Sequence, residues 1–273
     1  MQAAERFAVW CWGSGYQLLT ADSIKTKHLQ EYVDWQKHEG ARGGGKSVRS
    51  IQNDMAALRG CLRVAGRKQF ASSVEISNQS LGISGATRRG TKVAMCQEEH
   101  ELAVSRLIAE GHYGAAAMLD LERYLGLRGE EALRSIKSLE TWKKHLSEQG
   151  CITVVYGTKG GRPRRVNVPA VLRDKALLAI DQALLVVRQN KGKLIGGELK
   201  SAQQKYHAVV RNAGMTGSSA PHSERYWFTE QAVEEYRKRG FTDHESLAMT
   251  ATDLGHGDGR GRWVQNTYFQ KKK

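Results

Sequence analysis

The chain contains 273 residues, and its 42 Lys and Arg against 28 Asp and Glu give a formal net charge of +14 at pH 7. A hydrophobic fraction of 40% can form one large core or two ordinary ones, which excludes an intrinsically disordered chain. The positive charge favours a polyanionic partner, and nucleic acid is the one we expect. The four cysteines lie far apart and no apolar run spans a membrane, so we expect a cytoplasmic protein without a metal site or disulfide framework.

The N-terminal part of the chain has the spacing of an amphipathic helix pair. Leu29, Tyr32 and Val33 fall on one face of a helix over residues 28–38. After a Gly-rich break, apolar residues recur three and four positions apart, at Val48, Ile51, Met55, Leu58 and Leu62. The two patterns predict a small helical domain.

Residues 72–92 are rich in Ser, Gly, Thr and Arg and show no helical periodicity. Such a composition is typical of a connection between domains. We therefore expect a helical domain over residues 1–72, an interdomain linker over 73–96 and a second domain over 97–273.

The second domain combines helices with one short stretch of β-structure. Residues 100–111 and 112–127 predict helices, and the second is apolar nearly all round, as in a core helix. Two β-rich runs joined by "GTKGGRP" predict a hairpin over 151–156 and 164–169. Helical patterns then return at 170–189, 199–213 and 229–239. The predicted fold class is mostly α with a small antiparallel β-sheet.

The stretch "GARGGGKS", residues 40–47, matches the phosphate-binding pattern G-x-x-x-x-G-K-[ST]. That loop requires a buried parallel strand before it and a helix after it. A charged amphipathic helix precedes it here, so a Gly-rich turn between two helices explains the same letters. A nucleotide-binding protein, in which Lys46 would be essential, stays as a remote alternative.

Four separated segments carry residues suited to one reaction, and each alone has an ordinary structural explanation. Together they supply the groups needed for displacement at a phosphodiester. Arginines can clamp the non-bridging oxygens, because the guanidinium donates bidentately and stays charged. A lysine can protonate the leaving oxygen, and a tyrosine can attack while a histidine accepts its proton. The candidate residues are Arg128, Lys159, His222, Arg225, His256 and Tyr268.

The order of these residues resembles the tyrosine recombinases of the phage integrase family. "GLRGEEAL" (126–133) is similar to the first arginine box of that family, and its Glu131 to the supporting acid. "HSERY" (222–226) is similar to the His-x-x-Arg box, and "LGH" (254–256) precedes the tyrosine as it does in the family. The helix pair near the N-terminus resembles the helical core-binding domain of these proteins.

The resemblance implies a helical core-type DNA-binding domain and a mixed α/β catalytic domain that together clamp duplex DNA. Tyr268 would attack the scissile phosphate and form a 3′-phosphotyrosyl link, with no ATP, metal or other cofactor. The implied partner is double-stranded DNA with core-type recombination sites. A bacterial protein of a mobile genetic element is implied, associated with the nucleoid when bound, monomeric when free and tetrameric on DNA.

Basic runs in the linker and in the hairpin are expected to contact DNA phosphates. "RRGTK" and "RPRR" supply them, and the residues are Arg88, Arg89, Lys92, Arg162, Arg164 and Arg165.

The sequence departs from the family in two places. Tyr268 lies twelve residues after His256, farther than the family usually places it, and "GDGRGR" provides the glycines to loop out the extra residues. Tyr226 stands where the family often has a second histidine after the arginine. One alternative is therefore a catalytically inactive DNA-binding relative, such as an excision or architectural factor. A relaxing topoisomerase or a hairpin-forming resolvase would share the chemistry.

Overall fold

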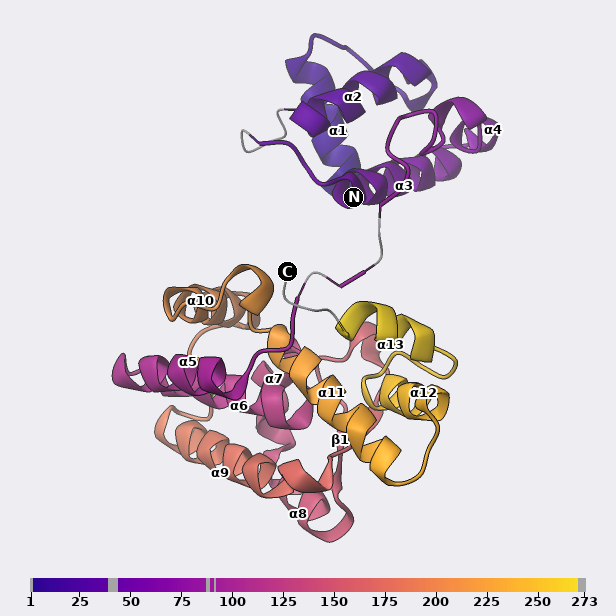
Figure 1. Cartoon of the computed structure of the whole chain (residues 1–273). Coiled ribbons are helices and arrows are strands. Elements are labelled where there is room, and N and C mark those ends of the chain that lie inside the picture. The colour runs from indigo at the N-terminus through magenta and orange to yellow at the C-terminus, as the bar shows by residue number, and fades with distance from the viewer. Residues whose placement is uncertain (1, 39–43, 87–88, 91, 270–273) are drawn as a thin grey trace. The chain divides into compact units, whose positions relative to one another are not determined.

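The computed structural model of the chain describes residues 2–38, 44–86, 89–90 and 92–269 (Figure 1). The chain divides into two compact units, Met1–Arg88 and Arg89–Lys273. Each unit has its own hydrophobic core. The fold is mostly helical with one two-stranded antiparallel sheet, which confirms the predicted fold class.

The N-terminal unit is built from helices and short 3-10 turns. Its elements are α1 (Gln2–Gly13), η1 (Ala21–Ser23), α2 (Thr26–His38), α3 (Val48–Val64), α4 (Lys68–Ala71) and η2 (Val74–Ile76). Both predicted helices are confirmed as α2 and α3. The Ser47 hydroxyl caps α3 by accepting from the backbone N–H of Ser50, which satisfies one of the free donors of its first turn.

Helix α1 was not predicted from the sequence. Its buried residues Ala3, Phe7 and Cys11 are spaced four apart, so they form one narrow stripe along the helix. The Phe7 ring meets the ring of Tyr32 edge to face with centroids 5.1 Å apart. The aromatic residues of α1 therefore complete a core that α2 and α3 leave open.

The first half of the predicted linker belongs to the N-terminal unit. Ile76, Leu81 and Ile83 are fully buried in its core. They are separated by polar residues at irregular spacing, which is why periodicity did not mark the segment as structured. The division between the units falls at residues 88 and 89, within the range 73–96 expected for the linker.

The phosphate-loop pattern lies between α2 and α3, and its residues 40–43 are outside the described range. Lys46 donates to Gln36 Oε1 and pairs with Asp54 Oδ2, both at 2.8 Å. The described residues of this unit include no strand. The helical context does not match a nucleotide-binding loop, and Lys46 instead fastens the turn between two helices.

The C-terminal unit contains nine helices and the sheet, within the described part of the chain. They are α5 (Gln97–Ala109), α6 (Tyr113–Leu125), α7 (Gly129–Leu133), α8 (Leu139–Gln149), β1 (Cys151–Val154), β2 (Arg164–Asn167), α9 (Arg173–Gln189), α10 (Leu199–Asn212), α11 (Ser223–Lys238), α12 (Asp243–Asp253) and α13 (Gly261–Tyr268). Short 3-10 turns connect them: η3 (Ser135–Lys137), η4 (Lys159–Gly161), η5 (Ala170–Leu172) and η6 (Gly217–Ser219).

Helix α6 forms the centre of this unit, as its nearly uniform apolar character predicted. It packs against α5, α9 and α11, and ten of its thirteen residues are buried. Helices α11, α12 and α13 pack on one another and form the C-terminal side of the unit (Figure 1). The core helix therefore supports α11, which carries the second arginine, and α13, which carries the tyrosine, packs on α11 and α12.

The predicted hairpin is confirmed, with strands shorter than the β-rich runs. Cys151 pairs with Asn167 and Val154 with Arg164 in an antiparallel register. Helices α8 and α12 were not predicted. The buried face of α12 is partly formed by Ser246, Thr250 and Ala251, so its apolar signal is weak.

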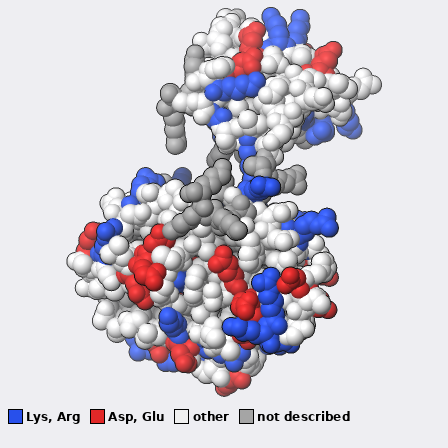
Figure 2. Space-filling view, viewed as in Figure 1, with Lys and Arg blue, Asp and Glu red and all other residues white. Residues whose placement is uncertain are grey.

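Two surface properties bear on the expected partners. Acidic and basic side chains are interspersed on the face of the C-terminal unit seen in Figure 2, so the excess positive charge is not gathered into one block there. Among the described residues, none of the helices is long and apolar enough to cross a membrane.

Candidate active site

The first arginine box lies where the chain reverses between α6 and α7. Gly126 ends α6 with a φ of 61°, and a Cβ added there would meet the Phe228 ring at 2.4 Å, so only glycine fits this turn. Arg128 follows as the residue before α7. Its backbone N–H and its Nη1 donate to the two carboxylate oxygens of Glu131, at 2.8 and 2.7 Å. The reversal thus presents Arg128 beside the acid that orients it.

Arg225 lies in the first turn of α11 and is fully buried. Its Nη1 donates to the carbonyl of Gly126, and its Nη2 donates to the carbonyl of Leu254. Its Nε donates to the Tyr268 hydroxyl at 3.2 Å. Arg128 Nη2 also donates to the Leu254 carbonyl, at 3.1 Å. The two arginines therefore share one backbone acceptor, the carbonyl of Leu254, which lies far from both of them in the sequence.

Tyr268 lies at the last position of α13 and is 2% exposed. Its hydroxyl oxygen lies 3.0 Å from His256 Nε2. The rings of Tyr226 and Trp263 meet the Tyr268 ring edge to face, with centroids 4.6 and 5.8 Å away. The looped-out segment after His256 thus leads into a helix that turns the phenol back toward the histidine and Arg225.

Glu131 is buried among three arginines. Arg164 Nη2 donates to Glu131 Oε2 at 2.6 Å, and Arg164 Nε donates to Oε1 at 3.4 Å. Arg225 Nη1 lies 3.9 Å from the same carboxylate. Burial alone would raise the pKa of Glu131. The charges of Arg164, Arg225 and Arg128 have the larger opposite effect and lower this pKa to about 2. This carboxylate is therefore ionised at neutral pH and offsets part of the positive charge of the pocket.

Arg164 departs from the expected role of a DNA-contacting residue. It is 7% exposed, and besides Glu131 it donates to the carbonyls of Asp253 and Gly126. A guanidinium held by a carboxylate and two carbonyls is directed into the protein rather than toward a phosphate outside it. Arg164 is thus a structural partner of the site, and the pleat of β2 explains the difference from its exposed neighbour Arg165.

The two histidines of the site stay neutral in this environment. Burial, followed by the nearby Arg225 and Arg128, lowers the pKa of His256 to about 3. The same causes lower the pKa of His222 to about 4, although the residue as a whole is exposed to solvent. A neutral imidazole facing the phenol can accept its proton. His222 lies beside the Tyr268 ring with centroids 6.4 Å apart.

Lys159 is not brought into this cluster. It is exposed in the turn of the hairpin, and the hydrogen bonds and ion pairs found among the described residues do not include it. Gly157, Gly160 and Gly161 all have positive φ, which lets the turn fold tightly. Gly157 lies against the backbone of Glu130, so the base of the turn is fixed while its tip faces solvent.

The other basic residues expected to contact DNA are more varied. Arg162 and Arg165 are exposed in the hairpin, and Arg89 is exposed at the start of the C-terminal unit. Lys92 is half-buried and donates to the carbonyl of Gly217. Arg88 lies outside the described residues.

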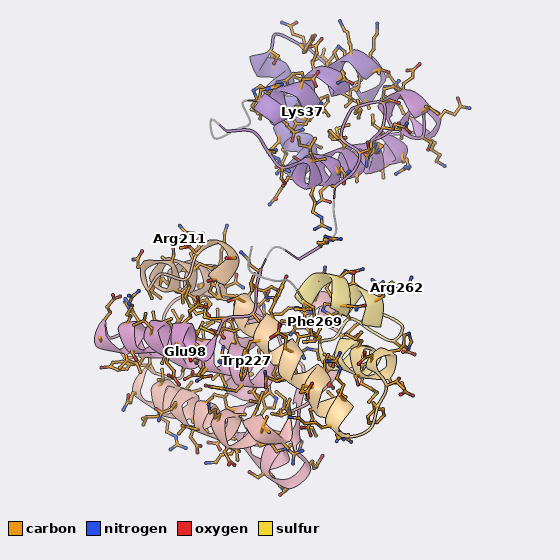
Figure 3. The ribbon with its side chains drawn as sticks, in the orientation of Figure 1. Lys37, Glu98, Arg211, Trp227, Arg262 and Phe269 are labelled. Atoms are coloured by element: carbon orange, nitrogen blue, oxygen red, sulfur yellow. The ribbon has the colours of Figure 1, made fainter. Side chains whose placement is uncertain are left out.

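A buried charged network beside α11 was missed by the sequence analysis. The Glu224 carboxylate accepts from Arg123 Nη1 at 2.5 Å and lies 2.9 Å from His100 Nδ1, while His100 Nε2 lies 3.0 Å from Asp120. The Arg123 guanidinium also lies over the ring of Trp227, which Figure 3 labels, at 3.8 Å from the ring centre. Burial lowers the pKa of His100, but its two carboxylate partners raise it overall. Glu224 precedes Arg225, so this network fixes the turn of α11 that carries the second arginine.

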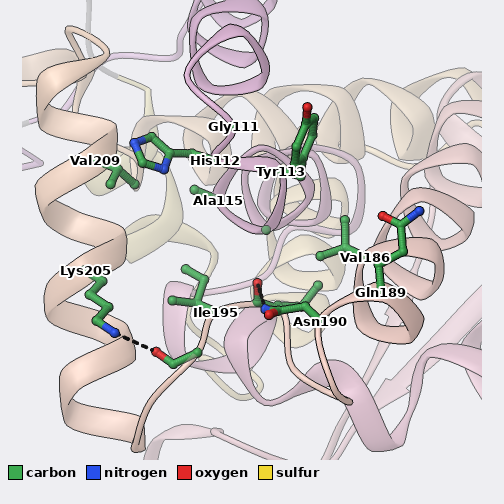
Figure 4. Close-up of a pocket in the computed structure, with 13 residues that line it drawn as sticks. Gly111, His112, Tyr113, Ala115, Val186, Gln189, Asn190, Ile195, Lys205 and Val209 are labelled. Carbon is green, nitrogen blue, oxygen red and sulfur yellow. Dashed lines mark hydrogen bonds between the residues drawn. The ribbon is translucent and has the colours of Figure 1, made fainter.

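A separate cavity of about 480 Å³ lies between α6, α9 and α10 (Figure 4). Its lining is mainly apolar, and Lys205 closes one side by donating to the carbonyl of Gly196 at 3.1 Å. The residues that line it do not include the arginines, the histidines or the tyrosine of the site. In the described part of the chain, no three His, Cys, Asp or Glu side chains are grouped as metal ligands would be.

The comparison with known proteins concerns the family of the chain and not the arrangement of these residues. A family model described as "Integrase" matches residues 82–231, and one described as "Phage integrase, N-terminal" matches residues 1–71. The first match contains Arg128, Lys159 and Arg225 and ends before His256 and Tyr268. The crystal structure of XerA recombinase covers 100% of this chain with 95% of its own, at 15% identity and a TM-score of 0.41. A comparison with curated proteins found no match.

The integrase model covers more than half of the chain, and the N-terminal model covers the part before it. The predicted resemblance to the tyrosine recombinases is thereby confirmed at the level of the family and the fold. This chain belongs to the phage integrase family.

Proposed function

We propose that this protein is a site-specific DNA recombinase that cuts and rejoins duplex DNA through Tyr268. The observation that carries the proposal is the contact of one hydroxyl with two groups from separate segments. The Tyr268 oxygen lies 3.2 Å from Arg225 Nε and 3.0 Å from His256 Nε2. A phenol placed between a buried guanidinium and a neutral imidazole is suited to attack a phosphate.

In the proposed cleavage step, the Tyr268 oxygen attacks the scissile phosphorus and its proton passes to His256. Arg128 and Arg225 stabilise the charge that develops on the non-bridging oxygens. The bond from phosphorus to the 5′-oxygen breaks, and Lys159 protonates that oxygen. The products are a 3′-phosphotyrosyl link and a free 5′-hydroxyl.

In the joining step, a 5′-hydroxyl of the partner strand attacks the phosphotyrosyl phosphorus and the phenol leaves. The phosphotyrosyl bond retains the energy of the diester, so the exchange requires no ATP. DNA binding must first break some hydrogen bonds of Arg128 and Arg225, because carbonyl oxygens of the protein accept from Nη groups of both side chains. Exchange between two duplexes requires several active sites, so we propose a tetramer on DNA.

The test is to incubate the protein with a set of overlapping nicked duplexes that cover the DNA flanking the gene, so that a covalent protein–DNA intermediate is trapped. The nicked strand loses its 5′-hydroxyl fragment after cleavage, so the adduct accumulates and is seen on a denaturing gel. We expect an adduct with the native chain and none with Tyr268→Phe. Tyr113→Phe is the matched control, because this phenol is 56% exposed and outside the site.

An adduct that persists in Tyr268→Phe would show that another residue is the nucleophile. Binding to a duplex without any adduct from the native chain would instead support the inactive DNA-binding relative. The long segment between His256 and Tyr268 is the feature that keeps this second candidate open.

A further inference from the structure

The chain enters the C-terminal unit through a segment that contacts the helix bearing the tyrosine. The backbone N–H of Gly90 donates to the carbonyl of Asn266 in α13 at 3.3 Å. Lys92 donates to the carbonyl of Gly217, and the N–H of Val93 donates to Ser218 at 3.3 Å. The segment is thus fastened on one side to α13 and on the other to η6, the turn that precedes α11.

Gly90 has no space for a side chain. A Cβ built on it would lie 1.8 Å from the carbonyl oxygen of Thr267 and 2.6 Å from the Tyr226 hydroxyl oxygen. Its φ lies outside the left-handed region, so a larger residue is not excluded by its backbone conformation. The close approach of the chain to α13 is therefore what requires glycine at this position.

The two groups that Gly90 touches are those that fix the position of Tyr268. Thr267 supplies the peptide unit immediately before Tyr268, and the Tyr226 ring packs edge to face on the Tyr268 ring at 4.6 Å. Both tyrosines are almost completely buried. Displacement of either neighbour would move the phenol relative to Arg225 and His256.

We propose that Gly90 is a positioning residue for the nucleophile, acting through Thr267 and Tyr226. The proposal rests on the proposed function only in naming Tyr268 as the nucleophile. It gives the first residues of the C-terminal unit an indirect effect on the reacting hydroxyl, through these two neighbours.

The first test compares Gly90→Ala and Gly90→Val with Gly196→Ala, in the full chain on the nicked duplexes. Gly196 lies in the same unit, with open space around its Cβ and without a left-handed φ. We expect Gly90→Val to slow adduct formation about 100-fold and Gly90→Ala less, because displacement of a reacting group by about 1 Å has an effect of this size. DNA affinity should stay within about twofold of native, because Gly90 contributes no charge to the interface.

The second test measures the position of the phenol without any DNA. N-acetylimidazole acylates accessible tyrosines, and peptide mapping reports the labelling of each one. We expect labelling of Tyr268 to rise several-fold in Gly90→Val while the exposed Tyr113 is labelled equally in all variants. Far-UV circular dichroism shows whether each variant is folded.

Tyr226→Phe provides a further variant if Gly90→Val does not fold. Removal of the Tyr226 hydroxyl relieves the contact at 2.6 Å, so Gly90→Ala should slow the adduct less in the Tyr226→Phe background. Equal adduct rates and equal Tyr268 labelling in native, Gly90→Ala and Gly90→Val would overturn the proposal. Absence of an adduct from the native chain would instead count against the proposed function, and the labelling experiment would still test Gly90.

Discussion

Two parts of the proposed active site differ in how firmly the protein holds them. Arg225, Glu131 and Tyr268 are buried and come from three separate segments, and Arg225 donates to the Tyr268 hydroxyl and lies 3.9 Å from the Glu131 carboxylate. The hairpin turn with Lys159 is exposed and fixed only at its base. We therefore expect the buried residues to lie close together before DNA binds, although both arginines must exchange their bonds to protein carbonyls for bonds to a phosphate. We expect Lys159, the proposed general acid, to reach the phosphate only in the complex with DNA.

The largest effect is expected from Glu131→Gln, in the firmly held part. The substitution leaves Arg164 and Arg128 without their shared carboxylate, and breaking a buried ion pair costs about 3 to 5 kcal/mol. Chemical unfolding should show a loss of this size. Glu130→Gln is the control, because its pair with Arg134 is exposed and should cost less than about 1 kcal/mol. Equal losses in the two variants would mean that the arginine cluster does not depend on Glu131.

In contrast to Glu131→Gln, Lys159→Ala should greatly reduce the rate of adduct formation and have little effect on the free energy of unfolding. Loss of a general acid typically slows a reaction about 100-fold or more. A duplex with sulfur in place of the bridging 5′-oxygen should restore the rate, because a thiolate leaves without protonation. Lys137→Ala is the control for loss of a nearby charge. A deficit that persists with the sulfur duplex would rule out the acid role of Lys159.

The pH dependence of the free energy of unfolding tests whether the buried part of the site is held in the folded chain with His256 neutral and Glu131 ionised. His256 has a pKa of about 3 in the folded chain against an ordinary 6.5, so the unfolded chain takes up its proton first as the pH falls. The contribution of His256 to stability is therefore complete above pH 6.5 and is lost toward pH 3, by at most about 1.4 kcal/mol per pH unit for one proton. Glu131, with a folded pKa of about 2 against 4.5, adds a loss below pH 4.5.

Unfolding by urea at several pH values between 4 and 8 measures this decline. His256→Gln should have a shallower slope above pH 4.5, where Glu131 does not yet contribute. An unchanged slope in this variant would show that the ring is not neutral in the folded chain.

The smallest effect is expected from the exposed hairpin arginines. Arg162→Ala with Arg165→Ala should reduce the slope of log affinity against log salt by about 2, because each arginine contacts about one phosphate. Lys143→Ala with Arg188→Ala removes the same charge from ion pairs on α8 and α9 and should leave the slope unchanged. The same decrease in both double variants would indicate a general charge effect instead of a hairpin contact.

The sequence predicted the helices whose apolar residues repeat regularly, including α2, α3 and α6. It did not predict α12, whose buried face is partly small and polar. The apolar pattern over residues 229–239 covers only part of α11, which begins at Ser223, because Glu224 and Arg225 in its first turn are buried through charged and polar partners from other segments. The spacing of apolar residues reveals only the apolar face of a helix. A helix turn whose buried side chains are charged is therefore not predicted from it.

The sequence by itself determined the family, the fold class and the residues suited to phosphate chemistry, because these depend on residue types in a fixed order. Only the tertiary structure decided that Arg164 faces Glu131 and that the linker meets α13 at Gly90. It also placed the Tyr268 hydroxyl between Arg225 and His256. Each of these contacts joins residues far apart in the chain, and such pairings depend on how the helices pack rather than on local spacing.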